Sequence, residues 1–115
     1  MTKSNINIEL ELDDDKIPCD IRWRASDSTI NAMQKAKAVM ISFWDGADKT
    51  ALRIDLWTKG MMVDEMADFF YQTITTMADS YKRATGQEAL ADDMKNFAKE
   101  FYKKFSQTQV KENAV

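Results

Sequence analysis

The sequence predicts an α+β fold with the element order ββαβαα, in a single domain spanning residues 1–106. In three short segments apolar residues alternate with polar ones, which is typical of strands. In three longer segments they recur every three or four residues, which is typical of helices. A chain of 115 residues with 44% hydrophobic and 30% charged residues is expected to form one soluble domain. The polar residues 107–115 are expected to form a disordered tail.

A β-hairpin is predicted near the N-terminus, because two alternating segments flank the polar turn at residues 13–16. Pro18 has no N–H to donate, so we expect it at the start of the second strand or that strand at a sheet edge. A third strand is predicted later in the chain. The alternating apolar residues are Ile6, Ile8, Leu10 and Leu12, then Ile17, Cys19, Ile21, Trp23 and Ala25, then Leu52, Ile54 and Leu56.

Three helices are predicted from spacings of three and four. The first begins at the capping residues 26–28, includes Ile30, and runs to about Trp44 before a break at Gly46. The second runs from Met62 toward Gly86, which is a natural stop for a helix. The third includes the apolar residues from Leu90 to Phe105.

The simplest arrangement of these elements is a three-stranded mixed sheet with strand order 2-1-3. A strand–helix–strand connection is expected to be right-handed, which places the third strand parallel to the second. The helices would then pack on one face of the sheet. The opposite face would carry polar and charged residues: Asn7, Glu9, Glu11, Arg22, Arg24, Arg53 and Asp55.

The composition removes the common catalytic and metal-binding classes. The chain has no histidine and one cysteine, so it lacks Ser-His-Asp and Cys-His catalysis, histidine-ligated zinc and an intramolecular disulfide. Neither GxGxxG nor GxxxxGK occurs, so no phosphate-binding loop is predicted. We therefore expect no enzyme activity, no cofactor and no metal. Cys19 is expected to be a small buried hydrophobic residue.

Charge and hydropathy also bear on partners and location. A net charge of −3 argues against nucleic-acid binding, which favours a basic excess. No apolar run approaches ~18 residues, so no transmembrane segment is predicted. The N-terminal residues alternate polar and apolar and do not resemble a signal peptide. A cytoplasmic location is therefore expected.

The segment from Ala51 to Thr85 carries a family resemblance. The sequence LRIDLWTKGMMVDEM, followed by FF-x-QT-x-x-TMADS-x-x-RAT, is similar to the GldC family of gliding-motility-associated proteins from the Bacteroidetes. The resemblance extends from about Ile6 to Phe105. It implies a small accessory protein of the gliding and associated secretion machinery, with no enzyme activity, no known cofactor and no catalytic residues to transfer.

A candidate interaction surface is predicted in the same segment. Trp57 lies on the polar side of the third strand, and Met61 and Met62 cannot easily both point inward. Trp57 and Met61 would therefore form an exposed patch of a kind enriched in interfaces. The charged residues nearby could be contact residues or could form structural salt bridges. The full candidate set is Arg53, Asp55, Trp57, Lys59, Met61, Asp64 and Glu65.

Three functional interpretations remain open from the sequence. The first is a non-enzymatic accessory factor that binds a protein of the gliding machinery or a second copy of itself as a homodimer. The second is a small-ligand or lipid-binding domain with a pocket lined by Met and Phe. The third is an enzyme with an Asp/Glu–Lys–Tyr site, which the spacing of these residues does not assemble.

Overall fold

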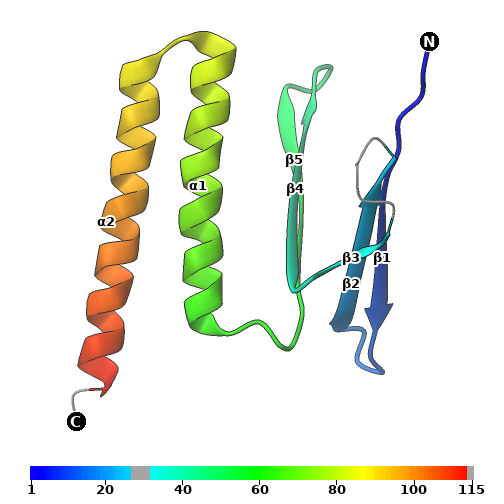
Figure 1. Cartoon of the computed structure of the whole chain (residues 1–115), viewed down its shortest axis with the longest axis horizontal. Coiled ribbons are helices and arrows are strands. Elements are labelled where there is room, and N and C mark those ends of the chain that lie inside the picture. Colours follow the sequence, from blue (N-terminus) through cyan, green and yellow to red (C-terminus); the bar gives the residue numbers. More distant parts are fainter. Residues whose placement is uncertain (27–31, 114–115) are drawn as a thin grey trace. The chain divides into compact units, whose positions relative to one another are not determined.

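A computed structural model describes residues 1–26 and 32–113 of the chain. The chain divides into two units, Met1–Met61 and Met62–Val115 (Figure 1). The first unit contains strands and the second contains helices. The α+β class predicted from the sequence is therefore confirmed. The prediction that residues 1–106 form one domain, with helices on one face of the sheet, stays a prediction.

The first sheet of the strand unit has the order β1-β2-β3 and is entirely antiparallel. Strand β1 (Ile6–Leu12) and strand β2 (Pro18–Ala25) form the predicted hairpin. Pro18 is the first residue of β2, which is one of the two positions predicted for it. Strand β3 (Gln34–Ala36) pairs with the other edge of β2. Ile21 on the central strand is fully buried, so the core of this sheet lies around β2.

The second sheet of the strand unit is a hairpin of strand β4 (Ala38–Asp45) and strand β5 (Thr50–Trp57). The two strands pair along their full length without a register shift. Asp45 closes the turn, because its Oδ1 accepts hydrogen bonds from the backbone N–H groups of Ala47 at 2.9 Å and Asp48 at 3.3 Å. Lys49 completes the turn with a φ of 52°.

The predicted helix ending near Trp44 is wrong, because the described part of that segment forms β3 and β4 instead. Its start, at residues 27–31, lies outside the described residues. The sheet order 2-1-3 is also wrong: β2 is central in the first sheet, and β5 pairs antiparallel with β4 in a separate sheet. Val39, Ile41 and Phe43 alternate along β4, and they find cross-strand partners in Leu56, Ile54 and Leu52. In a strand these three side chains lie on one face and contact the apolar side chains of β5. In a helix, residues two positions apart would point in different directions.

The second unit is a helical hairpin of helix α1 (Val63–Thr85) and helix α2 (Glu88–Asn113) (Figure 1). Both helices are predicted by the sequence. Gly86 ends α1 with a φ of 72°, and its N–H donates to the Lys82 carbonyl at 2.8 Å. Helix α2 continues through residues 107–113, where the sequence predicts a disordered tail.

Small residues allow the two helices to approach closely. Ala67 and Ala78 of α1 and Ala91 and Ala98 of α2 are buried. Rings and charges pair across the same seam: the Tyr71 and Tyr102 ring centroids are 5.2 Å apart, those of Phe70 and Phe101 are 6.4 Å apart, and Lys95 Nζ lies 2.7 Å from Asp79 Oδ1. The helical hairpin is therefore held by close backbone packing flanked by aromatic contacts and an ion pair.

Candidate interaction surface

Three of the predicted surface residues, Arg53, Asp55 and Trp57, lie at alternate positions of β5 and therefore share one face of it. Arg53 Nη2 donates to Asp55 Oδ1 at 3.2 Å and lies 3.0 Å from the Met40 sulfur on β4. The two charged side chains are 49% and 41% exposed. An exposed ion pair adds at most about 1 kcal/mol to stability, so the fold does not require this pair. It is available for contact with a partner.

Lys59 follows β5 and has a structural contact. Its ammonium forms an ion pair with the Asp13 carboxylate in the β1–β2 turn. Asp13 also accepts hydrogen bonds through Oδ1 from the backbone N–H groups of Asp15 and Ile17, each at 2.9 Å. The Lys59 hydrogen bond and the backbone bond from Ile17 hold the pKa of Asp13 below its ordinary value. The same ion pair raises the pKa of Lys59, first through the hydrogen bond to Asp13.

Thr58, which the sequence analysis did not single out, anchors the segment between Lys59 and β5. It is buried, and both its backbone N–H and its hydroxyl donate to the Lys37 carbonyl, at 3.0 Å and 2.6 Å. The Thr58 carbonyl in turn accepts a hydrogen bond from the Met61 N–H at 3.1 Å. Backbone hydrogen bonds and the Thr58 hydroxyl therefore hold the segment that contains Lys59 in place. No sequence signal distinguishes this threonine from an exposed one.

Asp64 and Glu65 lie in the first turn of α1 and cap it. Glu65 Oε1 accepts a hydrogen bond from the Met62 N–H at 3.2 Å, and Asp64 Oδ1 accepts one from the Glu65 N–H at 3.0 Å. Carboxylates at this end of a helix bind N–H groups that have no partner within the helix and complement its dipole. Both residues belong to the helical unit, whereas the other five candidates belong to the strand unit.

Trp57 and Met61, which the sequence predicts to form an exposed patch, are both half-buried in the structure, whereas Met62 is 61% exposed. A larger apolar surface lies on the other face of the β4–β5 hairpin. There Phe43, Leu52 and Ile54 are 56%, 54% and 48% exposed, and Ile41 faces Ile54 across the strands. We call Val39, Ile41, Phe43, Leu52, Ile54 and Leu56 the apolar hairpin face. The alternation of Val39, Ile41 and Phe43 before the Asp45–Gly46 turn is the sequence signal for it.

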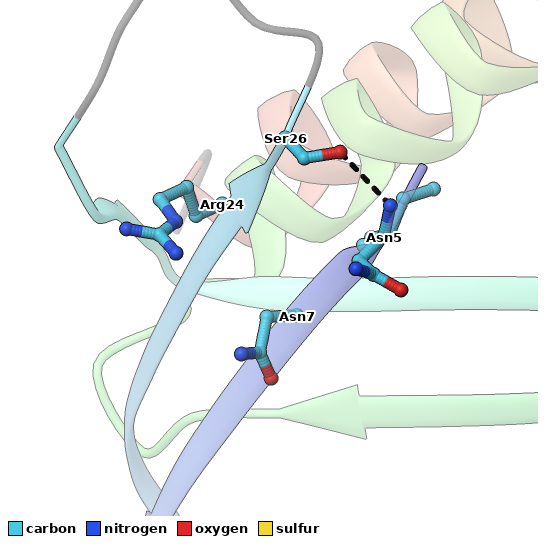
Figure 2. Close-up of a pocket in the computed structure, with 5 residues that line it drawn as sticks. Asn5, Asn7, Arg24 and Ser26 are labelled. Carbon is cyan, nitrogen blue, oxygen red and sulfur yellow. Dashed lines mark hydrogen bonds between the residues drawn. The ribbon is translucent and has the colours of Figure 1, made fainter. Parts of the chain in front are cut away.

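A polar hollow of about 310 Å³ lies at the open end of the β1–β2 hairpin (Figure 2). Its lining includes Arg24 and the carboxamides of Asn5 and Asn7, and Asn7 is the cross-strand partner of Arg24. The Asn5 N–H donates to Ser26 Oγ at 2.9 Å (Figure 2). These groups can donate hydrogen bonds to an anion. The lining residues include no histidine or carboxylate that could act as a general base, so the hollow offers polar binding and no acid–base chemistry.

An apolar hollow of about 360 Å³ lies along α2. Phe97, Phe101 and Phe105 line it at successive turns of the helix, together with Glu100 and Lys104. Phe97 is 60% exposed. The sequence interpretation of a ligand pocket lined by Met and Phe has its nearest counterpart here, with phenylalanine as the apolar component.

Three further features of the described residues concern the single cysteine, the metal-ligating side chains and the apolar content of the helices. Cys19 is exposed, which corrects the expectation of a buried residue; its thiol donates to the Glu11 carbonyl at 3.3 Å. Among residues 1–26 and 32–113, no group of three or more histidine, cysteine, aspartate or glutamate side chains could hold a metal ion. Neither described helix combines the length and apolar content needed to cross a bilayer.

Comparisons with known proteins place the chain in a family. Neither a curated protein nor a solved structure matches it. A family model described as gliding motility-associated protein GldC-like matches residues 18–107, which is most of the chain from β2 into the last turns of α2. This match confirms the resemblance carried by the segment from Ala51 to Thr85. The chain belongs to the GldC-like family of gliding motility-associated proteins.

Proposed function

We propose that the protein is a non-enzymatic, cytoplasmic accessory protein of the gliding motility and associated secretion machinery, and that it acts by binding other proteins through its β4–β5 hairpin. Membership of the GldC-like family supports the process, and this family is not known as an enzyme family. The apolar hairpin face supports the mode of action and is the observation that carries the proposal.

The apolar hairpin face has the composition of an interface core. Aromatic and aliphatic side chains stand side by side there: Phe43 faces Leu52, and Ile41 faces Ile54. Single exposed apolar residues are ordinary on a protein surface, whereas contiguous ones mark binding sites. The opposite face of the hairpin carries the Arg53–Asp55 pair, so a partner could distinguish the two faces by polarity.

The proposal is tested by cross-linking and co-purification from host cells, followed by quantitative mass spectrometry. The double variant Phe43→Ser/Ile54→Ser makes the apolar hairpin face polar. We expect it to lose the gliding or secretion proteins that co-purify with the wild type, and to fail to restore spreading of a deletion strain. The matched control is Phe97→Ser, which alters an equally exposed phenylalanine on α2. Equal recovery of those proteins by the wild type and the double variant would refute the proposal.

The hollow along α2 favours small-ligand or lipid binding as a second candidate function. Its volume of about 360 Å³ is near the lower end of the range for ligand pockets, roughly 300–1,000 Å³, and three phenylalanines supply apolar contact. We expect a fluorescent fatty-acid probe to bind the wild type and to bind Phe97→Ser more weakly, with Phe43→Ser/Ile54→Ser unaffected. A lack of saturable binding by the wild type would remove this candidate. Each variant therefore serves as the control for the other, and measuring both in both assays separates protein binding from ligand binding.

A further inference from the structure

The outer edge of β5 is not paired with any strand in the described part of the chain. The sheet contains only β4 and β5, and Thr50–Asp55 are all exposed. Such an edge presents a row of backbone N–H and C=O groups that can pair with another strand. Several of the usual devices that prevent pairing are missing from β5, because its eight residues include no proline and no lysine and its ladder with β4 has no bulge.

The sequence of β5 is complementary to itself when two copies run antiparallel. With Ile54 opposite Ile54 of the second copy, Arg53 lies opposite Asp55 of that copy, and Asp55 lies opposite its Arg53. Leu52 is then opposite Leu56 of the second copy, and Ala51 is opposite its Trp57. Opposite charges directly across a pair of strands are favourable, and a small residue opposite a large one packs without a clash. By symmetry, this register therefore creates two ion pairs and five apolar contacts.

In the described part of the chain, the two other long strands with an outer edge, β1 and β4, do not offer this complementarity. Strand β1 carries only acidic charges, Glu9 and Glu11, so self-pairing places them opposite each other or opposite neutral residues. Strand β4 has no charged residue before Asp45 at its end. Among the strands of residues 1–26 and 32–113, only β5 combines an exposed edge with charges of both signs two residues apart, at positions that exchange partners under a two-fold rotation.

We propose that a second copy of the chain docks on β5, giving an antiparallel four-stranded sheet with the order β4-β5-β5-β4. The dimer joins the two apolar hairpin faces into one continuous apolar surface. It also removes the exposed edge and converts a two-stranded sheet, which is marginally stable alone, into a wider one. This inference does not rest on the role in gliding motility, because it follows from the strand edge and its charges.

The first test measures the mass of the purified full-length protein by sedimentation velocity over a range of concentrations. We expect a dimer for the wild type. Arg53→Glu and Asp55→Lys each place like charges opposite each other twice, so we expect at least about tenfold weaker dimerisation for each variant alone. An equimolar mixture of the two variants restores opposite charges at both positions. We therefore expect the mixture to form a heterodimer.

Two control variants reverse charges on the other sheet: Arg24→Glu for Arg53→Glu, and Asp20→Lys for Asp55→Lys. Both controls should dimerise as the wild type does. Circular dichroism checks that each variant remains folded. A monomeric wild type at concentrations up to about 100 μM overturns the proposal, as do single reversals that dimerise as tightly as the wild type or a mixture that stays as weak as its components.

The second test determines the register between the two β5 strands and does not depend on the charge variants. In a Cys19→Ser background, Ile54→Cys places two cysteines directly opposite each other across the two-fold axis, at a separation that a disulfide can span. We expect rapid oxidation to a covalent dimer. Leu52→Cys is the matched control, because its counterpart in the second copy lies four positions away along β5. Equal cross-linking at positions 52 and 54, or none at 54, overturns the proposed pairing.

Discussion

The ammonium of Lys59 forms an ion pair with the carboxylate of Asp13, which joins the segment that leaves β5 to the turn between β1 and β2. The two residues are 46 positions apart in the sequence, counted from 13 to 59. Asp13 is also the acceptor that closes its own turn, through bonds from Asp15 and Ile17. One carboxylate therefore both shapes a hairpin turn and holds a connection between the two sheets of the strand unit.

Replacing Lys59 with methionine is predicted to raise the pKa of Asp13 toward its ordinary value of 3.8, because the hydrogen bond from Lys59 is the largest cause of the lowered value. The measurement is an NMR titration of the Asp13 carboxyl group. Lys16→Met is the control, since it removes a positive charge from the same turn without touching the ion pair. An unchanged Asp13 pKa in Lys59→Met would contradict the ion pair.

The same ion pair predicts how stability depends on pH. The pKa of Asp13 is lowered by folding, so its contribution to the free energy of unfolding is present above pH 3.8. This contribution is lost as the pH falls through the lower folded value. The pKa of Lys59 is raised, so its contribution is present below pH 10.5 and is lost as the pH rises through the higher folded value. We expect the difference in unfolding free energy between wild type and Lys59→Met to be largest near pH 7 and to shrink at both extremes, measured by urea denaturation.

Thr58→Val is predicted to lower the free energy of unfolding by about 0.5–1.5 kcal/mol, because it removes a buried hydroxyl that donates to the Lys37 carbonyl at 2.6 Å. Thr58→Ser keeps the hydroxyl and should recover most of that loss. Thr50→Val, at the exposed start of β5, removes a hydroxyl bond to the Asp48 carbonyl and serves as the matched control. Equal effects at positions 50 and 58 in urea denaturation would show that burial of Thr58 does not matter.

Gly86→Ala is predicted to destabilise the helical hairpin by about 1–2 kcal/mol, because a residue with a Cβ is strained at a φ of 72°. An added Cβ at this position meets no atom within 4 Å, so the expected cost is conformational and not steric. Gly60→Ala also has open space and does not lie at a positive φ; it should be neutral or slightly stabilising. Thermal denaturation of the two variants gives the comparison, and equal melting temperatures would argue against the left-handed cap.

Ala98→Leu is predicted to destabilise the protein by about 1–3 kcal/mol, because Ala98 is fully buried and lies on the same helical stripe as Tyr102, which contacts Tyr71 of α1. A larger side chain would push the helices apart. Ala84→Leu, at an exposed position of α1, is the control and should change stability by less than about 0.5 kcal/mol. If chemical denaturation shows no difference between the two, the helices do not pack along the alanine seam.

The predicted interaction surface was resolved by the structure into residues with different environments. The sequence brings Arg53, Asp55 and Trp57 to one face of a strand, because side chains of a strand alternate. It could not separate contact residues from structural ones. Lys59 has its ion-pair partner in a distant turn, and Asp64 and Glu65 have theirs at the N-terminus of a helix. The exposed apolar face of Phe43, Leu52 and Ile54 is not predicted, because Phe43 also fits the spacing of the helix predicted to end near Trp44.

The sequence alone predicts the elements whose stabilising pattern is local: the β1–β2 hairpin, strand β5 and the two long helices that meet at Gly86. The apolar stripe of a helix and the turn of a hairpin are written within a few consecutive residues. The fold of residues 38–45 and the order of the strands depend on tertiary contacts. Residues 38–45 fit either periodicity, and only cross-strand contacts of Val39, Ile41 and Phe43 with β5 select a strand. The sheet order depends on those cross-strand pairings, whose partners lie between 9 and 17 residues apart and leave no mark in a local pattern.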